Sequence, residues 1–309
     1  MRHASAVFAL IFVASLLLPA ASFSQATGQR PTSPWVWGIE GGALHQFDTS
    51  LSDADGDFSV SRVYIQPSLG YAWDRRTAVS LSLGMGDSDY DFSSGATIDG
   101  RRPWGRIRDY RVSLPVRFSP TEHTNAIIIP SIRSYAEKGA NQDDGRTEGV
   151  LAGIGWKVSD TLTIGPGFGW YTELGGGSRA FPIIILDWAI TDKLTLTTGR
   201  GLAASRGPGL ALNYSLNDNW TVALSGRSEK TRFALEDDGA VPEGFGQDKT
   251  LPLLLSVQYS PRPMTEVSAF IGSEFAGELS VEDKDGDTVA RTDYDIAVSV
   301  GMAFRLRFP

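Results

Sequence analysis

The sequence of 309 residues contains no cysteine. The chain therefore has no disulfide, no thiolate metal ligand and no thiol nucleophile, and it cannot carry a lipid on an N-terminal cysteine. Only three histidines are present, and one of them, His3, lies next to the start. These absences exclude disulfide-rich scaffolds, exported lipoproteins and cysteine enzymes. We expect no cofactor and no metal site.

Long apolar runs are also missing after the first 24 residues. No run reaches the roughly 18 residues that a membrane-spanning helix requires. The mean hydropathy of -0.12 is compatible with a transmembrane β-barrel, because only alternate residues of its strands contact lipid. The net charge of -8 and the isoelectric point of about 5.0 argue against a nucleic-acid partner.

The first residues have the pattern of an export signal. Two basic residues precede an apolar run from Ala6 to Leu18, and small residues follow it. This pattern predicts a cleavable signal over residues 1–24, with cleavage after Ser24 or Ala26. A retained anchor helix is the alternative, but the run is too short to span a bilayer. Residues 25–309 show no change of composition and are predicted to form one domain.

The end of the chain gives the clearest structural pattern. From Asp293 to Phe308, the even positions are apolar and the odd positions are small, charged or hydroxylated. Side chains of a strand alternate between two faces, so one face here suits lipid and the other suits a lumen. Strands of soluble sheets usually run about 3 to 10 residues. This long, two-faced strand predicts an all-β fold, a closed antiparallel transmembrane β-barrel, with Tyr294 facing lipid and Asp295 facing the lumen.

Turns and loops predict the number of strands. Six short turns alternate with seven longer, more acidic loops, so these connections join fourteen strands, although twelve or sixteen remain possible. Both chain ends then lie on the side of the short turns, which is periplasmic in bacterial outer-membrane barrels. The longest predicted loop runs from Ser228 to Asp248.

Tryptophan placement is a second signal. Six of the eight tryptophans lie at the start of the first strand or close to a short turn, at the same height as three other aromatic residues. Amphipathic rings settle at the level of lipid headgroups, so this distribution predicts a periplasmic aromatic girdle. The predicted girdle residues are Trp35, Trp37, Trp73, Phe118, Trp156, Trp188, Trp220, Tyr259 and Phe308.

Five short segments allow a comparison with a known family. They are Pro166–Trp170, Trp188–Leu194, Gly199–Ser205, Gly207–Leu210 and Phe275–Leu279. These segments resemble a family of bacterial outer-membrane β-barrel proteins of unknown function, and the likeness covers most of the mature chain, more strongly in its second half. The resemblance implies the barrel fold and an outer-membrane location in a Gram-negative bacterium. It implies no activity, substrate or site.

The expected partners follow from that location. Membrane lipid and lipopolysaccharide would contact the outward face. The chain end also resembles the terminal signal that barrel-insertion machinery reads, except that Pro309 follows the last aromatic residue, Phe308. The oligomeric state stays open.

Charged residues on the predicted lumen face form the candidate site. They lie among many small residues, and fourteen strands are intermediate between filled barrels of about eight strands and open channels of about sixteen. Small luminal side chains favour a passive diffusion pore for small polar solutes, in which charges of both signs set selectivity. The alternative is a non-conducting structural or surface-binding barrel, whose charges pair across the lumen and whose external loops act. The candidates are Arg111, Arg117, Arg133, Glu137, Asp187, Arg227, Glu266, Glu274, Asp295 and Arg305.

Other chemistry is sparse. His45 and His123 are predicted at opposite ends of the barrel, so a lipid-modifying enzyme lacks a nucleophile with a base in reach. Two acidic runs, Asp53–Asp57 and Asp283–Asp287, have the residue types of a calcium loop but not its spacing. Solvated hairpin turns are therefore favoured over a calcium site. We expect a protein without catalytic activity.

Overall fold

The computed structural model describes residues 33–52, 56–101, 103–198, 209–239 and 241–308. The predicted export signal, the first residues of the acidic run Asp53–Asp57 and the segment Gly199–Ser205 lie outside these ranges, as do Gly207 and Pro208.

Seventeen β-segments follow one another along the described chain. They are β1 (Trp35–Ser50), β2 (Asp57–Ala72), β3 (Thr77–Phe92), β4 (Arg106–Ser113), β5 (Val116–Thr121), β6 (Thr124–Glu137), β7 (Arg146–Lys157), β8 (Leu162–Thr172), β9 (Ser178–Ala189), β10 (Leu194–Thr198), β11 (Gly209–Ser215), β12 (Trp220–Arg227), β13 (Glu229–Ala234), β14 (Phe245–Arg262), β15 (Thr265–Glu282), β16 (Thr288–Tyr294) and β17 (Ala297–Phe308). Three pairs, β4 with β5, β12 with β13 and β16 with β17, each continue one strand across a short break. The segments therefore form fourteen strands.

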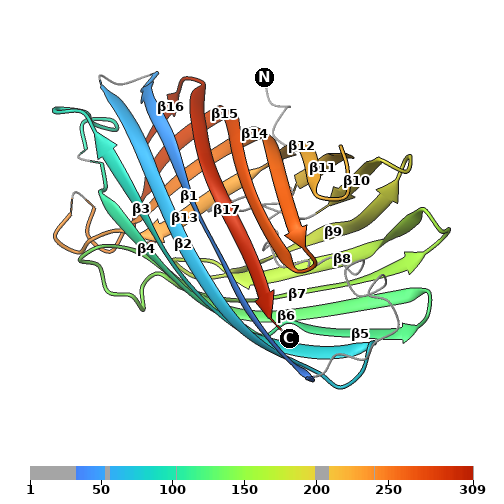
Figure 1. The fold of residues 1–309 in the computed structure, drawn as a ribbon. Coiled ribbons are helices and arrows are strands. Elements are labelled where there is room, and N and C mark those ends of the chain that lie inside the picture. The colour runs from blue at the N-terminus through green and yellow to red at the C-terminus, as the bar shows by residue number, and fades with distance from the viewer. Residues whose placement is uncertain (1–32, 53–55, 102, 199–208, 240, 309) are drawn as a thin grey trace, which may run out of the picture.

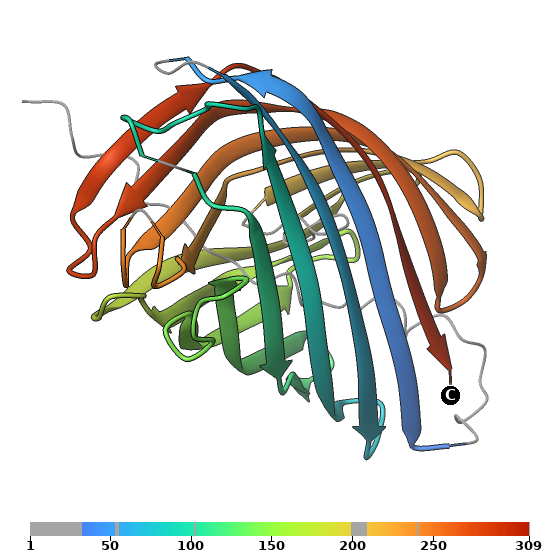
Figure 2. The ribbon, with the colours of Figure 1, turned by 90° about the vertical axis from the view of Figure 1, so that its left-hand side faces the viewer.

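The sheet closes on itself. Strands that follow one another in sequence pair antiparallel, and the last strand pairs with the first, with Trp37 opposite Phe308 and Gln46 opposite Ser299. Figures 1 and 2 show the strands wrapped into a barrel, with short turns at one end and longer loops at the other. The predicted closed antiparallel barrel of fourteen strands is confirmed.

Within the described ranges, no helix is long and apolar enough to cross a membrane.

The outward face carries an apolar band. Along β14, Leu251, Leu253, Leu255 and Val257 are exposed, whereas the residues between them are buried. Almost all of the remaining strands repeat this pattern. So much exposed apolar surface is unfavourable in water and favourable against lipid, which makes the barrel a transmembrane one.

The aromatic residues predicted as a girdle all lie at the turn end. Trp73 lies in the turn between β2 and β3, and Phe118 lies opposite Thr77 at the start of β3. Trp220 and Tyr259 are cross-strand neighbours whose ring centroids are 4.6 Å apart. Eight of the nine are exposed, and Phe118 is half-buried.

The loop end is built from fewer strands than the turn end. β13 extends beyond β11, and its Ala234 pairs with Ala136 of β6. On the opposite side, Leu51 just after β1 bridges to Tyr294 of β16. These contacts close a smaller ring of nine segments, five on one side (β1, β2, β3, β4 and β6) and four on the other (β13, β14, β15 and β16). We call this ring the collar.

The prediction of a loop from Ser228 to Asp248 is wrong at both of its ends. β13 and the start of β14 form a paired hairpin there, with Phe233 opposite Gly246, and the connecting loop spans only residues 235–244. Acidic and glycine residues suggested a loop. The side chains of Phe233 and Asp248 are buried inside the collar, and this tertiary contact stabilises the strands against their local preference.

A break between β16 and β17 reverses the faces that were predicted for Tyr294 and Asp295. Tyr294 is only 5% exposed and packs inside the collar, edge-on to Phe58 with ring centroids 5.1 Å apart. Asp295 is exposed, with Oδ1 3.5 Å from the Ser52 hydroxyl of the first loop. Both predictions are wrong because an extra residue at the break shifts the side-chain alternation by one. From Ala297 onward the odd positions face inward.

Candidate functional site

The collar encloses an aromatic core. Trp104 of the loop between β3 and β4 lies edge-on to Phe233 and Tyr90, with ring centroids 5.0 Å and 5.7 Å apart. Phe58 and Ile107 complete the centre of this cluster and are at most 1% exposed. A ring of about eight strands has an interior just wide enough for side chains. The nine-segment collar is accordingly filled by side chains.

A buried carboxylate lies beneath the aromatic core. Asp248 of β14 accepts hydrogen bonds from the Arg62 guanidinium at 2.8 Å, the Tyr90 hydroxyl at 2.8 Å and the Tyr294 hydroxyl at 3.2 Å. Arg62 belongs to β2, so this ion pair crosses the lumen. Glu229 of β13 lies 3.9 Å from the same guanidinium. Charged groups so deeply buried need such partners, because desolvation is costly.

More polar side chains are buried on the turn side of Asp248. Arg227 lies 3.4 Å from Glu229, and Glu274 is only 2% exposed. Among the described residues, the guanidinium of Arg227 and the side-chain amide of Gln46 make no hydrogen bond. We call Arg62, Asp248, Arg227, Glu229 and Glu274 the charged floor of the collar.

Glu137 of β6 connects the loops of the collar. Its two carboxylate oxygens accept backbone N–H bonds from Gly105 at 2.8 Å and from Glu236 at 3.0 Å. Gly105 precedes β4 and Glu236 follows β13, so one side chain of β6 joins the loops of the two strands that flank it in the ring. Such charge-assisted bonds to backbone N–H groups are stronger than neutral ones.

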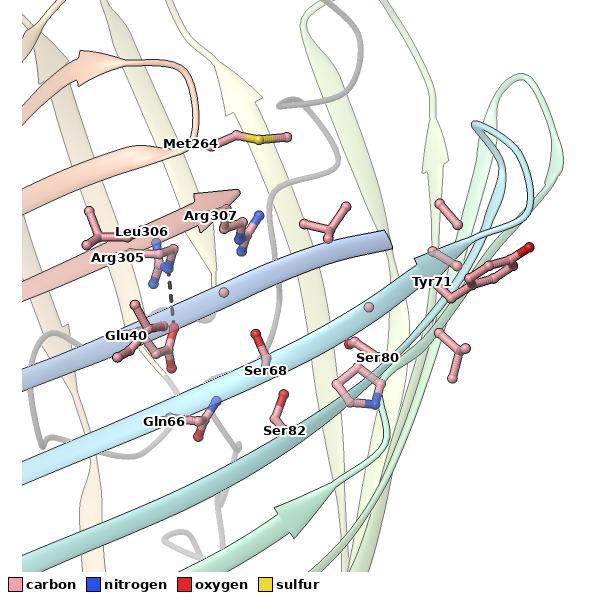
Figure 3. Close-up of a pocket in the computed structure, with 18 of the residues that line it drawn as sticks. Glu40, Gln66, Ser68, Tyr71, Ser80, Ser82, Met264, Arg305, Leu306 and Arg307 are labelled. Carbon is pink, nitrogen blue, oxygen red and sulfur yellow. Dashed lines mark hydrogen bonds and ion pairs between the residues drawn. The ribbon is translucent and has the colours of Figure 1, made fainter. Parts of the chain in front are cut away.

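The turn end of the lumen contains a cavity of about 100 Å³ lined by both polar and apolar residues. The inward faces of β1, β2 and β3 and the end of β17 form its wall, which we call the turn-end pocket (Figure 3). Small and hydroxylated residues predominate there. The polar lining residues are Glu40, Gln66, Ser68, Tyr71, Ser80, Ser82, Arg117, Arg305 and Arg307.

Ion pairs in this pocket are concentrated on one arginine. Arg305 lies 3.3 Å from Glu40 and 3.5 Å from Glu266, and Figure 3 draws its bond to Glu40. Arg307, two residues further along β17, forms no ion pair or side-chain hydrogen bond with any described residue. Arg117 of β5 lines the same pocket.

Glycines keep the pocket hollow. A Cβ atom at Gly38 would lie 2.5 Å from the Ser68 hydroxyl and 3.7 Å from Cγ of Arg307. The absence of that atom leaves space for both side chains. At Gly70 a Cβ atom would make ordinary contacts of 3.5 Å with Cβ of Ser80 and with the carbonyl oxygen of Val79, so a side chain can be added there without a clash.

The structure divides the predicted lumen residues among several levels. It brings together those at the pocket, those in the floor, and Arg111 with Arg133, which are direct cross-strand partners on β4 and β6. The residues at the turn end are Arg117, Asp187, Glu266 and Arg305; those on the wall between are Arg111 and Arg133; those in the charged floor are Arg227 and Glu274; Glu137 lies in the collar, and Asp295 lies outside the lumen.

Several important residues were missed from the sequence. Glu40, Arg62 and Arg307 occupy inward positions of alternating strands, so strict alternation would have found them. Asp248 and Glu229 were both predicted to lie in a loop. No local pattern indicated that these two would meet Arg62.

Part of the lumen wall is apolar. Ile127, Ile129, Leu151, Phe181 and Ile183 form a buried cluster on β6, β7 and β9. These residues contact one another along the inner surface, which leaves the hollow on the side of β1, β2 and β3.

His45 has a neighbour that the sequence does not reveal. Its Nδ1 lies 3.0 Å from the Ser61 hydroxyl across β1 and β2, on the exposed face. Among the described residues no carboxylate hydrogen-bonds to this ring, and the surrounding strand N–H groups are paired in the sheet. The pair therefore lacks an orienting group and oxyanion donors. His123 lies in the turn between β5 and β6.

The second acidic run forms a hairpin turn. The Asp283 carboxylate accepts backbone N–H bonds from Asp285 at 3.0 Å and from Asp287 at 2.9 Å. Gly286 has a φ of 86°, a conformation that favours glycine. Oδ1 of Asp283 is therefore used in hydrogen bonds within the turn.

No protein-family model and no curated protein matches this sequence. Solved structures resemble it in fold. An outer-membrane channel from Pseudomonas putida F1 is 8% identical, with a TM-score of 0.49, and the match covers 92% of this chain and 98% of that one. A FadL homologue from Pseudomonas aeruginosa is 14% identical, with a TM-score of 0.47 and coverage of 89% and 90%. The toluene transporter TodX of P. putida is 10% identical, with a TM-score of 0.46 and coverage of 94% and 92%.

These similar structures are bacterial outer-membrane β-barrel proteins. At such low identities and scores, the likeness does not extend to activity or solute. The closed strand pairing and the outward apolar band define the class of this protein, which is a transmembrane β-barrel of the bacterial outer-membrane type.

Proposed function

We propose that this barrel is a gated channel in the outer membrane of a Gram-negative bacterium, through which small polar solutes diffuse passively. The collar is the closed gate, and the turn-end pocket belongs to a hydrated vestibule. In this proposal the export signal directs the chain across the inner membrane, and the short turns face the periplasm. An impermeant maleimide added to intact cells should then label a cysteine placed in the 235–244 loop and not one placed at Asp74.

The division of the lumen is the observation that carries this proposal. The turn end is hollow and has charged and hydroxylated side chains in its lining, whereas Arg62 and Asp248 are buried at the boundary with the collar. Replacing a buried ion pair by apolar residues of similar volume is often neutral or stabilising, so charges are a poor choice for a permanent plug. Charged groups suit an interior that becomes hydrated when the gate opens.

The hairpin of β13 and β14 is the element that would move. Its tip meets β6 through the pairing of Ala234 with Ala136 and through the Glu137 bond to Glu236. Phe233 also packs edge-on against Tyr135 of β6, and Ala234 and Phe245 share a small apolar cluster with Ala136, Ala140 and Leu174, so opening would separate these contacts. Displacement of the hairpin would open the ring and expose the charged floor to the loop side.

Planar-bilayer recording of the full chain tests the channel. We expect rare discrete conductance steps from the unaltered protein, and frequent steps from a variant that combines Trp104→Ala with Phe233→Ala, because the collar core then contains a cavity. Phe275→Ala is the control, since Phe275 is exposed on the outward face. If neither the unaltered protein nor the double variant shows conductance steps at any voltage, the channel proposal is contradicted.

A second function is favoured by the packing of the collar. A non-conducting barrel that acts through its external loops would need a filled loop end as a platform, and the collar core provides one. In that case the collar variant should stay electrically silent while the folded protein still reaches the membrane. The bilayer recordings thus decide between the two functions.

A further inference from the structure

We infer that the turn-end pocket binds a small soluble oxyanion, a carboxylate or a phosphate. The inference deepens the proposed channel function, because the bound anion would be a permeating solute or a regulator of permeation. Binding itself does not depend on conduction, so the two can be tested separately.

Positive charge is in excess in this pocket. Three arginines and one glutamate line it, in a protein whose net charge is -8. The nearby Glu266 and the lining Glu40 both contact Arg305. Both of these carboxylates are thereby engaged by a single cation.

Arg307 carries a guanidinium that the described residues leave unpaired. It forms no ion pair or side-chain hydrogen bond with them, and it lines the turn-end pocket. Arg117 lines the same cavity from β5. Guanidinium groups bind carboxylate and phosphate oxygens through paired N–H bonds, so two arginines around one small space suit an oxyanion.

Strands β2 and β3 supply neutral donors on the same wall. The hydroxyl groups of Ser68, Ser80 and Ser82 and the amide of Gln66 line the cavity, and Figure 3 shows Gln66, Ser68 and Ser82 on β2 and β3, with β1 between them and the β17 end that carries Arg305 and Arg307. Hydroxyl and amide groups can donate hydrogen bonds to an anion. A cation would find there only the carboxylates that already contact Arg305.

The size and position of the cavity select a small ligand. A volume of about 100 Å³ holds several water-sized groups. The cavity opens on the inward face of the strands, whereas membrane lipids contact the outward face. A soluble anion therefore fits better than a lipid headgroup, although both carry the same phosphate chemistry.

Calorimetric titration of the full chain in neutral detergent tests the site. The probes are sodium phosphate, sodium acetate and, as a cation control, choline chloride, all at one ionic strength. We expect saturable binding of at least one oxyanion and none of choline. Arg307→Gln should weaken that binding about tenfold, because a charge-assisted hydrogen-bonded contact is lost.

Two further variants separate a built site from general electrostatics. Gly70→Val fills the hollow without changing charge and should also weaken binding. Arg106→Gln removes the same charge from an exposed arginine that pairs with Asp87 and Asp89, and it should leave binding unchanged. Equal losses in Arg307→Gln and Arg106→Gln, or no loss with Gly70→Val, would overturn the site.

The remaining outcomes are also decisive. Absence of oxyanion binding to the unaltered protein overturns the inference. Binding of short-chain phosphatidylglycerol without binding of free phosphate or acetate would assign the site to lipid and overturn it as well. A barrel that binds phosphate without conducting in bilayers would contradict the proposed channel and support the binding site. A barrel that conducts without binding an oxyanion would support the channel and contradict the binding site.

Discussion

The collar and the turn-end section are two parts of one sheet with opposite interiors. Nine segments surround the collar, and aromatic side chains fill it, whereas fourteen strands surround the turn end, which keeps a cavity. The difference follows the geometry of barrels, because interior width grows with the number of strands. A barrel can therefore change along its axis from a packed core to a hydrated lumen.

Strand β2 passes through both regions, and its inward residues differ between them. Its inward residues are Phe58 and Val60 in the collar, Arg62 in the charged floor, and Gln66 and Ser68 at the turn-end pocket. The outward residues of the same strand are exposed from Ser61 to Pro67 and half-buried at Leu69 and Tyr71. The interior environment, and not the secondary structure, sets these residue types.

Removal of collar packing should have the largest effect on stability. Phe233→Ala deletes a side chain that is 0% exposed, and we expect the free energy of unfolding to fall by about 3–5 kcal/mol. Urea unfolding in detergent micelles, followed by tryptophan fluorescence, measures this change. Phe275→Ala, on the outward face, should cost clearly less. Equal losses would mean that the collar is not a packed core.

Loss of the buried carboxylate should come next. Asp248→Asn leaves Arg62 with the more distant Glu229 as its ion-pair partner, and we expect a loss of about 3 kcal/mol. In the double variant with Arg62→Met, much of that loss should be recovered, because no buried charge then lacks its partner. A double variant that is less stable than either single one would contradict a pair that couples across the lumen.

Loss of the ion pair at the turn end should have the smallest effect. The side chains of Arg305 and Glu40 are 25% and 22% exposed, so water screens their attraction. We expect Arg305→Gln to change the free energy of unfolding by about 1 kcal/mol or less. The same urea series measures it. A loss as large as that of Asp248→Asn would show that the turn end is as dry as the collar.

The sequence was sufficient for the features that depend on regular alternation. Strand periodicity and the two kinds of connection predicted the closed barrel and its fourteen strands, because side-chain alternation and turn residues are local properties. The same alternation placed Arg117 and Arg305 on inward faces. Short turns and aromatic residues also predicted which side chains share one end of the barrel.

Features that depend on breaks and on distant strands were not predictable. The extra residue before β17 is invisible in the pattern of Asp293 to Phe308, yet it exchanges the faces of Tyr294 and Asp295. The meeting of Arg62 with Asp248 depends on unequal strand lengths, which let β13 reach β6 and close the collar. The local sequence indicates neither the extra residue nor the contact between Arg62 and Asp248.

Cysteine labelling tests the division of the lumen most directly, since the natural chain offers no competing thiol. The comparison uses Ser80→Cys in the turn-end pocket and Val60→Cys in the collar, both at inward positions of neighbouring strands. We predict rapid reaction of a charged maleimide with Ser80→Cys in liposomes when the reagent reaches the turn end. Reaction at Val60→Cys should be on the order of a hundredfold slower from either side, because access requires local opening. Similar rates at both positions would contradict the closed collar and the hydrated vestibule together.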